Sequence, residues 1–163
     1  MIRQVYISFI AAIIVLTGCH TQKNATDAKS EQSYISEAQK LEVHLSSGNN
    51  SGKGSILLSF TVTNPTNKPL RFCKWETPFE PAIGKYFGIT DEKGEEALFR
   101  GAMARRVMPP PASALTTVPA HGSVKTIIDL ADKYELTGHR YTVSYTGGGV
   151  SGLKEGNKIT LSL

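Results

Sequence analysis

Apolar and polar side chains alternate along several short segments of the chain after residue 40. Two segments show the pattern most clearly, with apolar residues at Leu41, Val43 and Leu45 in the first and at Ile56, Leu58, Phe60 and Val62 in the second. A period of two places successive side chains on opposite faces of an extended chain, so each segment predicts a strand with one buried face. Further strands are predicted at residues 70–75, 86–90, 97–100, 104–107, 115–118, 124–128, 141–145 and 159–163.

Turn-forming residues separate these segments at short intervals. Residues 64–69 predict a turn, residues 46–55 predict a loop rich in Gly, Ser and Asn, and residues 131–136 predict a single helical turn. Phe72 and Cys73 interrupt the alternation, which indicates a bulge or burial on both faces. Many short strands without a long helix predict an all-β protein, a single antiparallel immunoglobulin-like β-sandwich over residues 39–163.

The first nineteen residues have the layout of an export signal. Arg3 precedes an apolar run over residues 5–16, and small residues then lead into Cys19. This run is shorter than the roughly 20 residues that a membrane-spanning helix needs, which favours a signal peptide. The sequence Leu16-Thr17-Gly18-Cys19 resembles the bacterial lipobox, which implies cleavage before Cys19 and acylation of its thiol. An ordinary secretion signal with a cysteine at this place is the alternative.

These features divide the chain into a lipoprotein signal peptide (1–18), an acylated cysteine with a flexible tether (19–38) and the β-sandwich domain (39–163). The tether is predicted because residues 20–38 hold too few large apolar side chains to offset the entropy lost on ordering. The expected location is the bacterial cell envelope, with the lipid as membrane anchor. In a Gram-negative cell the outer membrane is expected, because His20 and not Asp follows the cysteine.

Charge and residue spacing exclude several classes of function. The formal net charge of +4, or +3 without Arg3, is too small for a nucleic-acid-binding surface. The four histidines are not spaced as zinc ligands, and no Gly-x-Ser-x-Gly elbow occurs, so we expect no metal, no cofactor and no catalytic residue. With Cys19 acylated, Cys73 lacks a disulfide partner. It is expected to be a small buried apolar residue, with a redox or crosslinking thiol as the alternative.

Six motifs follow one another between residues 59 and 145. They are Phe60-Thr61-Val62-Thr63-Asn64, Lys74-Trp75-Glu76-Thr77-Pro78, residues 100–106, Gly122-Ser123-Val124, Asp129-Leu130 with Tyr134, and Tyr141-Thr142-Val143. In this order they resemble the N-terminal β-sandwich region that precedes the catalytic domain in deuterolysin-type, lysine-specific metalloendopeptidases. The zinc-binding His-Glu-x-x-His motif of that family does not occur in the sequence. The resemblance therefore implies the fold, and a pro-region's contact with a protease or another partner, but no catalytic residue.

The most specific motif also has an explanation in packing. Trp75 is the single tryptophan, and we expect it to fill the sandwich core where a strand ends, with Lys74 facing solvent and Thr77 and Pro78 forming the turn. A ligand site is the alternative. In the same way, we expect Asp129 to cap the short helical turn and Tyr134 to pack at the edge of the sandwich.

Two loops are the candidate partner-binding surface. The first, residues 76–84, carries Phe79, and the second, residues 100–114, carries Arg100, Arg105 and Arg106 followed by three prolines. Binding residues concentrate on loops held by a rigid scaffold, and prolines reduce the entropy lost on docking. An acidic partner or lipid headgroups fit this surface, and a merely solvated loop is the alternative.

Together these features predict a non-catalytic envelope lipoprotein that acts as a protein-binding module, either protease-interacting or inhibitor-like. A structural envelope lipoprotein without a specific ligand is one alternative. A peptidase-related enzyme with an unrecognised site is the other.

Overall fold

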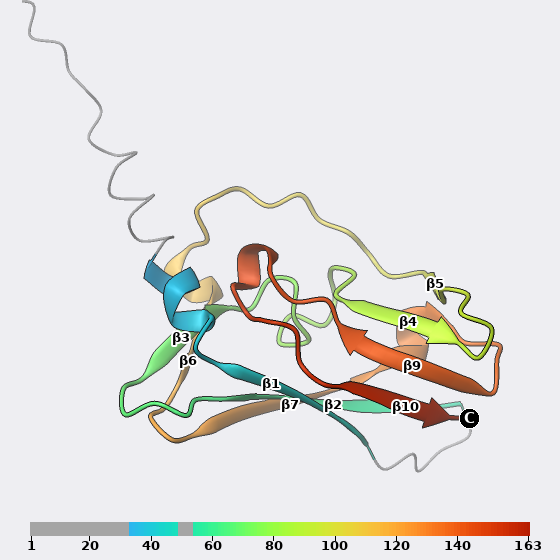
Figure 1. The fold of residues 1–163 in the computed structure, drawn as a ribbon. Helices are drawn as coiled ribbons and strands as arrows, with labels where there is room; N and C mark the ends of the chain where they lie inside the picture. Colours follow the sequence, from blue (N-terminus) through green and yellow to red (C-terminus); the bar gives the residue numbers. More distant parts are fainter. Residues whose placement is uncertain (1–32, 49–53) are drawn as a thin grey trace, which may run out of the picture.

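A computed structural model describes residues 33–48 and 54–163 of the chain, and all structural statements refer to these residues. One sheet pairs β1 (Glu42–Ser47), β2 (Leu57–Thr63) and β7 (Ser123–Asp129). The second sheet pairs β10 (Lys158–Ser162), β9 (Arg140–Tyr145) and β4 (Phe87–Asp91). Every pairing is antiparallel, and the sheets form two layers (Figure 1). The predicted all-β antiparallel sandwich is confirmed.

Two shorter antiparallel pairs complete the strands. β3 (Leu70–Cys73) pairs with β6 (Leu115–Val118), and β5 (Leu98–Phe99) pairs with β8 (Tyr134–Glu135). Between β2 and β3 the chain turns around the buried side chain of Asn64, whose amide donates to the carbonyls of Lys68 and Val118. The turn predicted at residues 64–69 is therefore confirmed. The Asn64 side chain stabilises it by donating to two backbone carbonyls that would otherwise need a backbone N–H.

The burial of side chains follows the alternation seen in the sequence. In β1 the side chains of Val43 and Leu45 are buried, whereas Glu42 and His44 are exposed. β2 lies between β1 and β7, and there even the polar Ser59 is buried. Phe72 and Cys73 at the end of β3 are both fully buried, as the interrupted alternation predicted.

Aromatic rings fill the space between the two sheets. The register of β4 on β9 places Phe87 opposite Tyr145, and both rings contact Phe60 of β2 edge-to-face, with centroid distances of 6.3 and 5.0 Å. Such pairs contribute about 0.5–1.5 kcal/mol beyond the area that they bury. At the open edge of β1, the amide of Asn157 donates to the carbonyl of Leu45 and accepts from its N–H, which ties this edge to the segment before β10.

Two predicted elements differ from the structure. Residues 104–107 do not form a strand: they run as an exposed loop that has no neighbouring strand to pair with. The helical turn predicted at residues 131–136 is a 3-10 turn at Leu130–Asp132, and it ends because residues 134–135 pair with β5 as β8.

The boundary of the folded domain also differs from the prediction. Residues 33–38 form a short helix against the sandwich, with Tyr34 and Ala38 buried, so they do not belong to a flexible tether. The folded domain therefore includes residues 33–38, ahead of the predicted start at residue 39. The predicted signal peptide, Cys19 and the rest of the predicted tether lie outside the described residues.

Candidate protein-binding site

Trp75 lies just beyond β3, where the chain leaves the sheet. Its side chain is 9% exposed and belongs to a small buried cluster with Tyr34, Cys73 and Ala114. The prediction that Trp75 is buried is confirmed, but its place in the sandwich core is wrong. The core between the sheets is a separate cluster, and Trp75 instead fills the space below the N-terminal helix.

A tight turn follows Trp75. The Thr77 hydroxyl donates to the Lys74 carbonyl at 2.6 Å and accepts from the Phe79 N–H at 3.2 Å, and the Thr77 and Pro78 side chains are buried. Lys74 is partly exposed, as expected for the outward side of the turn. Thr77 and Pro78 of the motif therefore have a local structural role.

Phe79 is only partly exposed. Its ring packs edge-to-face against Phe72 at 5.3 Å and against Phe60 at 6.1 Å, so it joins the aromatic core. The prediction of Phe79 as a partner-binding residue came from its place in a loop, but the ring turns inward from that loop. The exposed residues of the first predicted loop, 76–84, include Glu76, Pro81 and Ala82.

Arg106, a residue of the predicted binding surface, makes contacts within the domain. Its guanidinium lies over the Trp75 ring, 4.7 Å from the ring centroid, and it forms an ion pair with Glu80. Cation–π contacts of this kind contribute about 0.5–2 kcal/mol, depending on exposure. Arg106 therefore joins the two predicted loops, and its charge is already balanced by Glu80.

Arg100 and Arg105 differ in their freedom to bind. The exposed guanidinium of Arg100 pairs with Glu135 at 2.5 Å. Arg105 is exposed and forms no ion pair with any residue that the structure describes. Of the three arginines proposed from the sequence, Arg105 has the charge that is most available to a partner.

Exposed apolar side chains precede and follow Arg105 along the chain. Met103, Val107 and Met108 have exposed fractions of 71%, 84% and 44%, whereas most large apolar residues of the domain are buried. We call residues 102–111 the Met–Arg loop. No acidic residue occurs between Glu96 and Asp129 in the sequence. The exposed side chains of this loop are therefore apolar or basic, and none is acidic. Grouped apolar exposure of this kind marks an interaction surface more often than scattered exposure does.

The two predicted loops lie side by side. The Gly84 N–H donates to the Ala102 carbonyl at 2.8 Å, and Ile83 and Ala102 form an isolated β-bridge. A hollow of about 60 Å³ between the loops is lined by residues of both, including Met103 and Arg106. The expectation that the two loops form one continuous surface agrees with this geometry.

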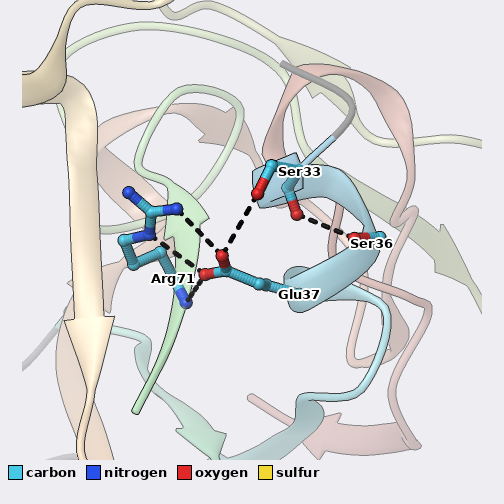
Figure 2. Close-up of polar contacts among 4 residues, drawn as sticks. All are labelled: Ser33, Ser36, Glu37 and Arg71. Carbon is cyan, nitrogen blue, oxygen red and sulfur yellow. Dashed lines mark hydrogen bonds and ion pairs between the residues drawn. The ribbon is translucent and has the colours of Figure 1, made fainter. Parts of the chain in front are cut away.

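The helix at residues 33–38 is fixed by a carboxylate (Figure 2). Both oxygens of Glu37 accept from Arg71 of β3: one from the guanidinium at 2.8 Å, the other from the backbone N–H and from Nε, each at 3.0 Å. The hydrogen bonds from Arg71 hold the pKa of the Glu37 carboxyl below its ordinary value. The Tyr34 hydroxyl of the same helix donates to the Val150 carbonyl at 3.1 Å. Sequence reasoning missed Glu37 and Arg71, because the two lie 34 residues apart.

Cys73 is enclosed in the Trp75 cluster. It is fully buried, and burial raises the pKa of its thiol to about 11. A thiol with this pKa is almost entirely protonated at neutral pH and therefore a poor nucleophile. The geometry supports the interpretation of Cys73 as a small buried apolar residue.

Asp129 and Tyr134 support the opposite end of the sandwich. Asp129 accepts hydrogen bonds from the Ser55 hydroxyl and from the N–H groups of Ile56 and Ala131. Burial acts to raise the pKa of Asp129, but these hydrogen bonds outweigh it and hold the pKa below its ordinary value. The buried Tyr134 hydroxyl donates to the Phe87 carbonyl, and burial raises the pKa of Tyr134 to about 12. The expected capping role of Asp129 is observed, whereas Tyr134 lies in the core and not at the edge.

We expect Asp129→Ala to lower the free energy of unfolding by about 1–3 kcal/mol, because two backbone N–H groups lose their acceptor. The contribution of Asp129 is present above its ordinary pKa of 3.8 and is lost as the pH falls through the lowered pKa. The difference between variant and wild type in urea unfolding should therefore shrink between pH 5 and pH 2. The exposed Asp132→Ala serves as control, and an equal loss in both variants would contradict the assignment.

One buried charge was not predicted from the sequence. Lys133 is 7% exposed, and its Nζ lies 5.2 Å from the centroid of the Tyr86 ring without a hydrogen-bond partner among the described residues. Burial lowers the pKa of Lys133, and the nearby charge of Glu80 partly opposes this effect. Nothing in the local sequence marks this lysine as buried, because its burial depends on segments far away in the chain.

The described residues contain neither a metal-binding cluster nor a membrane-spanning helix. No group of three or more His, Cys, Asp or Glu side chains in these ranges is placed to hold a metal ion. No helix within them is both long and apolar enough to cross a bilayer.

Comparison with known proteins finds similarity to part of a curated protein. No family model matches the chain. A protein of the fungus Arthroderma benhamiae, named "Uncharacterized secreted protein", is 36% identical over 96 residues, which cover 55% of this chain and 49% of that protein. The chain therefore spans about half the length of the curated relative that it matches. It is similar to part of a secreted protein.

Proposed function

We propose that this chain is a lipid-anchored, non-catalytic module of the bacterial cell envelope that binds another protein through the Met–Arg loop. The exposed group of Met103, Arg105, Val107 and Met108 on a rigid sandwich is the observation that carries the proposal. Three consecutive prolines, residues 109–111, stiffen the loop, so that it loses less entropy on docking. The apolar side chains supply contact area, and Arg105 favours a partner with an acidic surface.

Export and anchoring rest on different observations. The lipobox-like sequence ending in Cys19 supports a lipid anchor in the envelope, at the outer membrane in a Gram-negative cell. The name of the Arthroderma benhamiae relative supports an exported protein. The resemblance to a metalloendopeptidase pro-region makes a protease the first partner class to test. Binding without cleavage would make the module an inhibitor or a scaffold for that protease.

Capture from envelope extract tests the proposed surface. Immobilised domain without the lipid is expected to retain a specific protein, whereas Met103→Ser/Val107→Ser should reduce capture at least ten-fold, since truncated anchor residues dominate binding energy. Arg105→Glu should weaken capture and make the remaining binding less sensitive to salt. Arg106 is left unchanged, because its guanidinium supports Trp75.

The matched controls lie on β7. Ile127 is 56% exposed and Lys125 is exposed, and neither belongs to the Met–Arg loop. Ile127→Ser and Lys125→Glu should therefore leave capture unchanged. Two outcomes would rule out the Met–Arg loop as the binding surface. In one, the loop variants capture the protein as well as wild type does. In the other, the two control variants lose as much capture as the loop variants.

A further inference from the structure

Two polar contacts hold the N-terminal helix, residues 33–38, to the rest of the domain. Glu37 holds the helix to Arg71 on β3, and the Tyr34 hydroxyl reaches the Val150 carbonyl in the 3-10 turn Gly149–Ser151. The helix backbone also lies directly against Gly152: a Cβ at Gly152 would come within 3.1 Å of the Ile35 Cα. The helix is therefore seated in a fitted site and is not merely adjacent to the domain.

A continuous path of contacts joins this helix to the Met–Arg loop. Tyr34 and Trp75 belong to one buried cluster. The Arg106 guanidinium lies 4.7 Å from the centroid of the Trp75 ring and pairs with Glu80. The Met–Arg loop is therefore attached, through Arg106, to the same tryptophan that the helix covers. Removal of the helix exposes the Trp75 cluster and weakens the platform on which Arg106 rests.

The helix depends on its contacts with the rest of the domain. It has six residues, too few for a helix that is stable by itself in water. Its ion pair is partly exposed, with 43% of the Arg71 side chain and 24% of the Glu37 side chain accessible, so that solvent weakens it. Tyr34 and Ala38 are buried, so release of the helix requires local opening of these contacts and not of the two sheets.

We propose that residues 33–38 form a latch: docked, the helix holds the Met–Arg loop in place through Trp75, and released, it frees the loop. This inference rests on the proposed function, because the Met–Arg loop is the proposed binding surface. A partner that binds the freed loop more tightly than the held loop would therefore favour release of the helix.

Two reporters in the chain make the latch measurable. In full-length mature protein carrying Cys19→Ser, Cys73 is the single thiol and Trp75 the single tryptophan. Tyr34→Ala/Glu37→Ala is expected to increase the rate of Cys73 labelling at least five-fold and to shift Trp75 fluorescence to longer wavelength. Trypsin should then cut faster after Arg105 and Arg106.

Two further variants separate the steps of the proposal. Ser36→Ala, an exposed change on the same helix, should leave all three readouts at the wild-type level. Glu80→Gln removes the ion pair of Arg106 without touching the helix, so trypsin should cut faster while Cys73 labelling stays slow. None of these measurements needs the partner, so they succeed or fail independently of the capture experiment.

Three outcomes would overturn the latch. Unchanged labelling and fluorescence in the double variant would show that the helix does not cover the Trp75 cluster. Faster labelling with unchanged trypsin cleavage would show that the helix and the Met–Arg loop are not coupled. Global unfolding of both the double variant and the milder Glu37→Gln, seen by circular dichroism, would show that the helix is an integral part of the fold and cannot be released separately.

Discussion

Phe60→Ala is expected to lower the free energy of unfolding by about 3–5 kcal/mol. Phe60 is fully buried on the central strand β2, and its ring contacts three other rings, those of Phe79, Phe87 and Tyr145. The truncation leaves a cavity between the two sheets that rigid strands cannot close. Because small domains have only about 5–15 kcal/mol of stability, the variant should be close to unfolding at 37 °C. Urea unfolding followed by Trp75 fluorescence measures the loss.

The control for this prediction lies on the outer face of β7. Ile127 is 56% exposed, so Ile127→Ala should change stability by no more than about 0.5 kcal/mol. Trp75→Ala should also destabilise the domain, but through the separate cluster below the helix. A Phe60→Ala variant as stable as Ile127→Ala would mean that the aromatic core does not hold the two sheets together.

The strands were predictable because their signal is local. Alternation at residues 41–45 and 56–62 corresponds to β1 and β2, since one face of each strand is buried whichever strands lie beside it. The pair Phe72 and Cys73 was also informative, because two adjacent apolar residues in a strand require burial on both faces. The turn at residues 64–69 was marked by Asn and Pro, whose side chains determine the local backbone.

The errors arose where long-range contacts decide the structure. Residues 104–107 have a plausible strand composition, but no neighbouring strand pairs with them. The helix at residues 33–38 is too short to be stable by itself, and its contacts with distant segments, among them those of Tyr34 and Glu37, order it. β8 was missed because its two residues are extended only through their pairing with β5.

The candidate site divides in the same way. From the sequence, Phe79 and the three arginines were equivalent members of two loops. The structure turns Phe79 into the core, pairs Arg100 and Arg106 with carboxylates, and leaves Arg105 exposed beside apolar side chains. Sequence locates loops well, because turn residues mark them. It does not show which loop residues face inward, since that depends on the surface over which the loop passes.

The second large effect concerns Cys19. If Cys19 carries the acyl chains, Cys19→Ser should move nearly all of the protein from the membrane fraction to the soluble fraction, or leave an unprocessed precursor. Two acyl chains anchor a protein stably, whereas the apolar and basic side chains of the Met–Arg loop alone bind a bilayer only weakly. Fractionation with immunodetection, and the mass of the N-terminal peptide, measure the two outcomes.

Cys73→Ala is the matched control for this substitution. It removes the other cysteine of the chain from a buried position in the folded domain, so it should leave the protein in the membrane fraction. A Cys19→Ser protein that is still cleaved before residue 19 and still sediments with membranes would contradict lipid attachment at this residue.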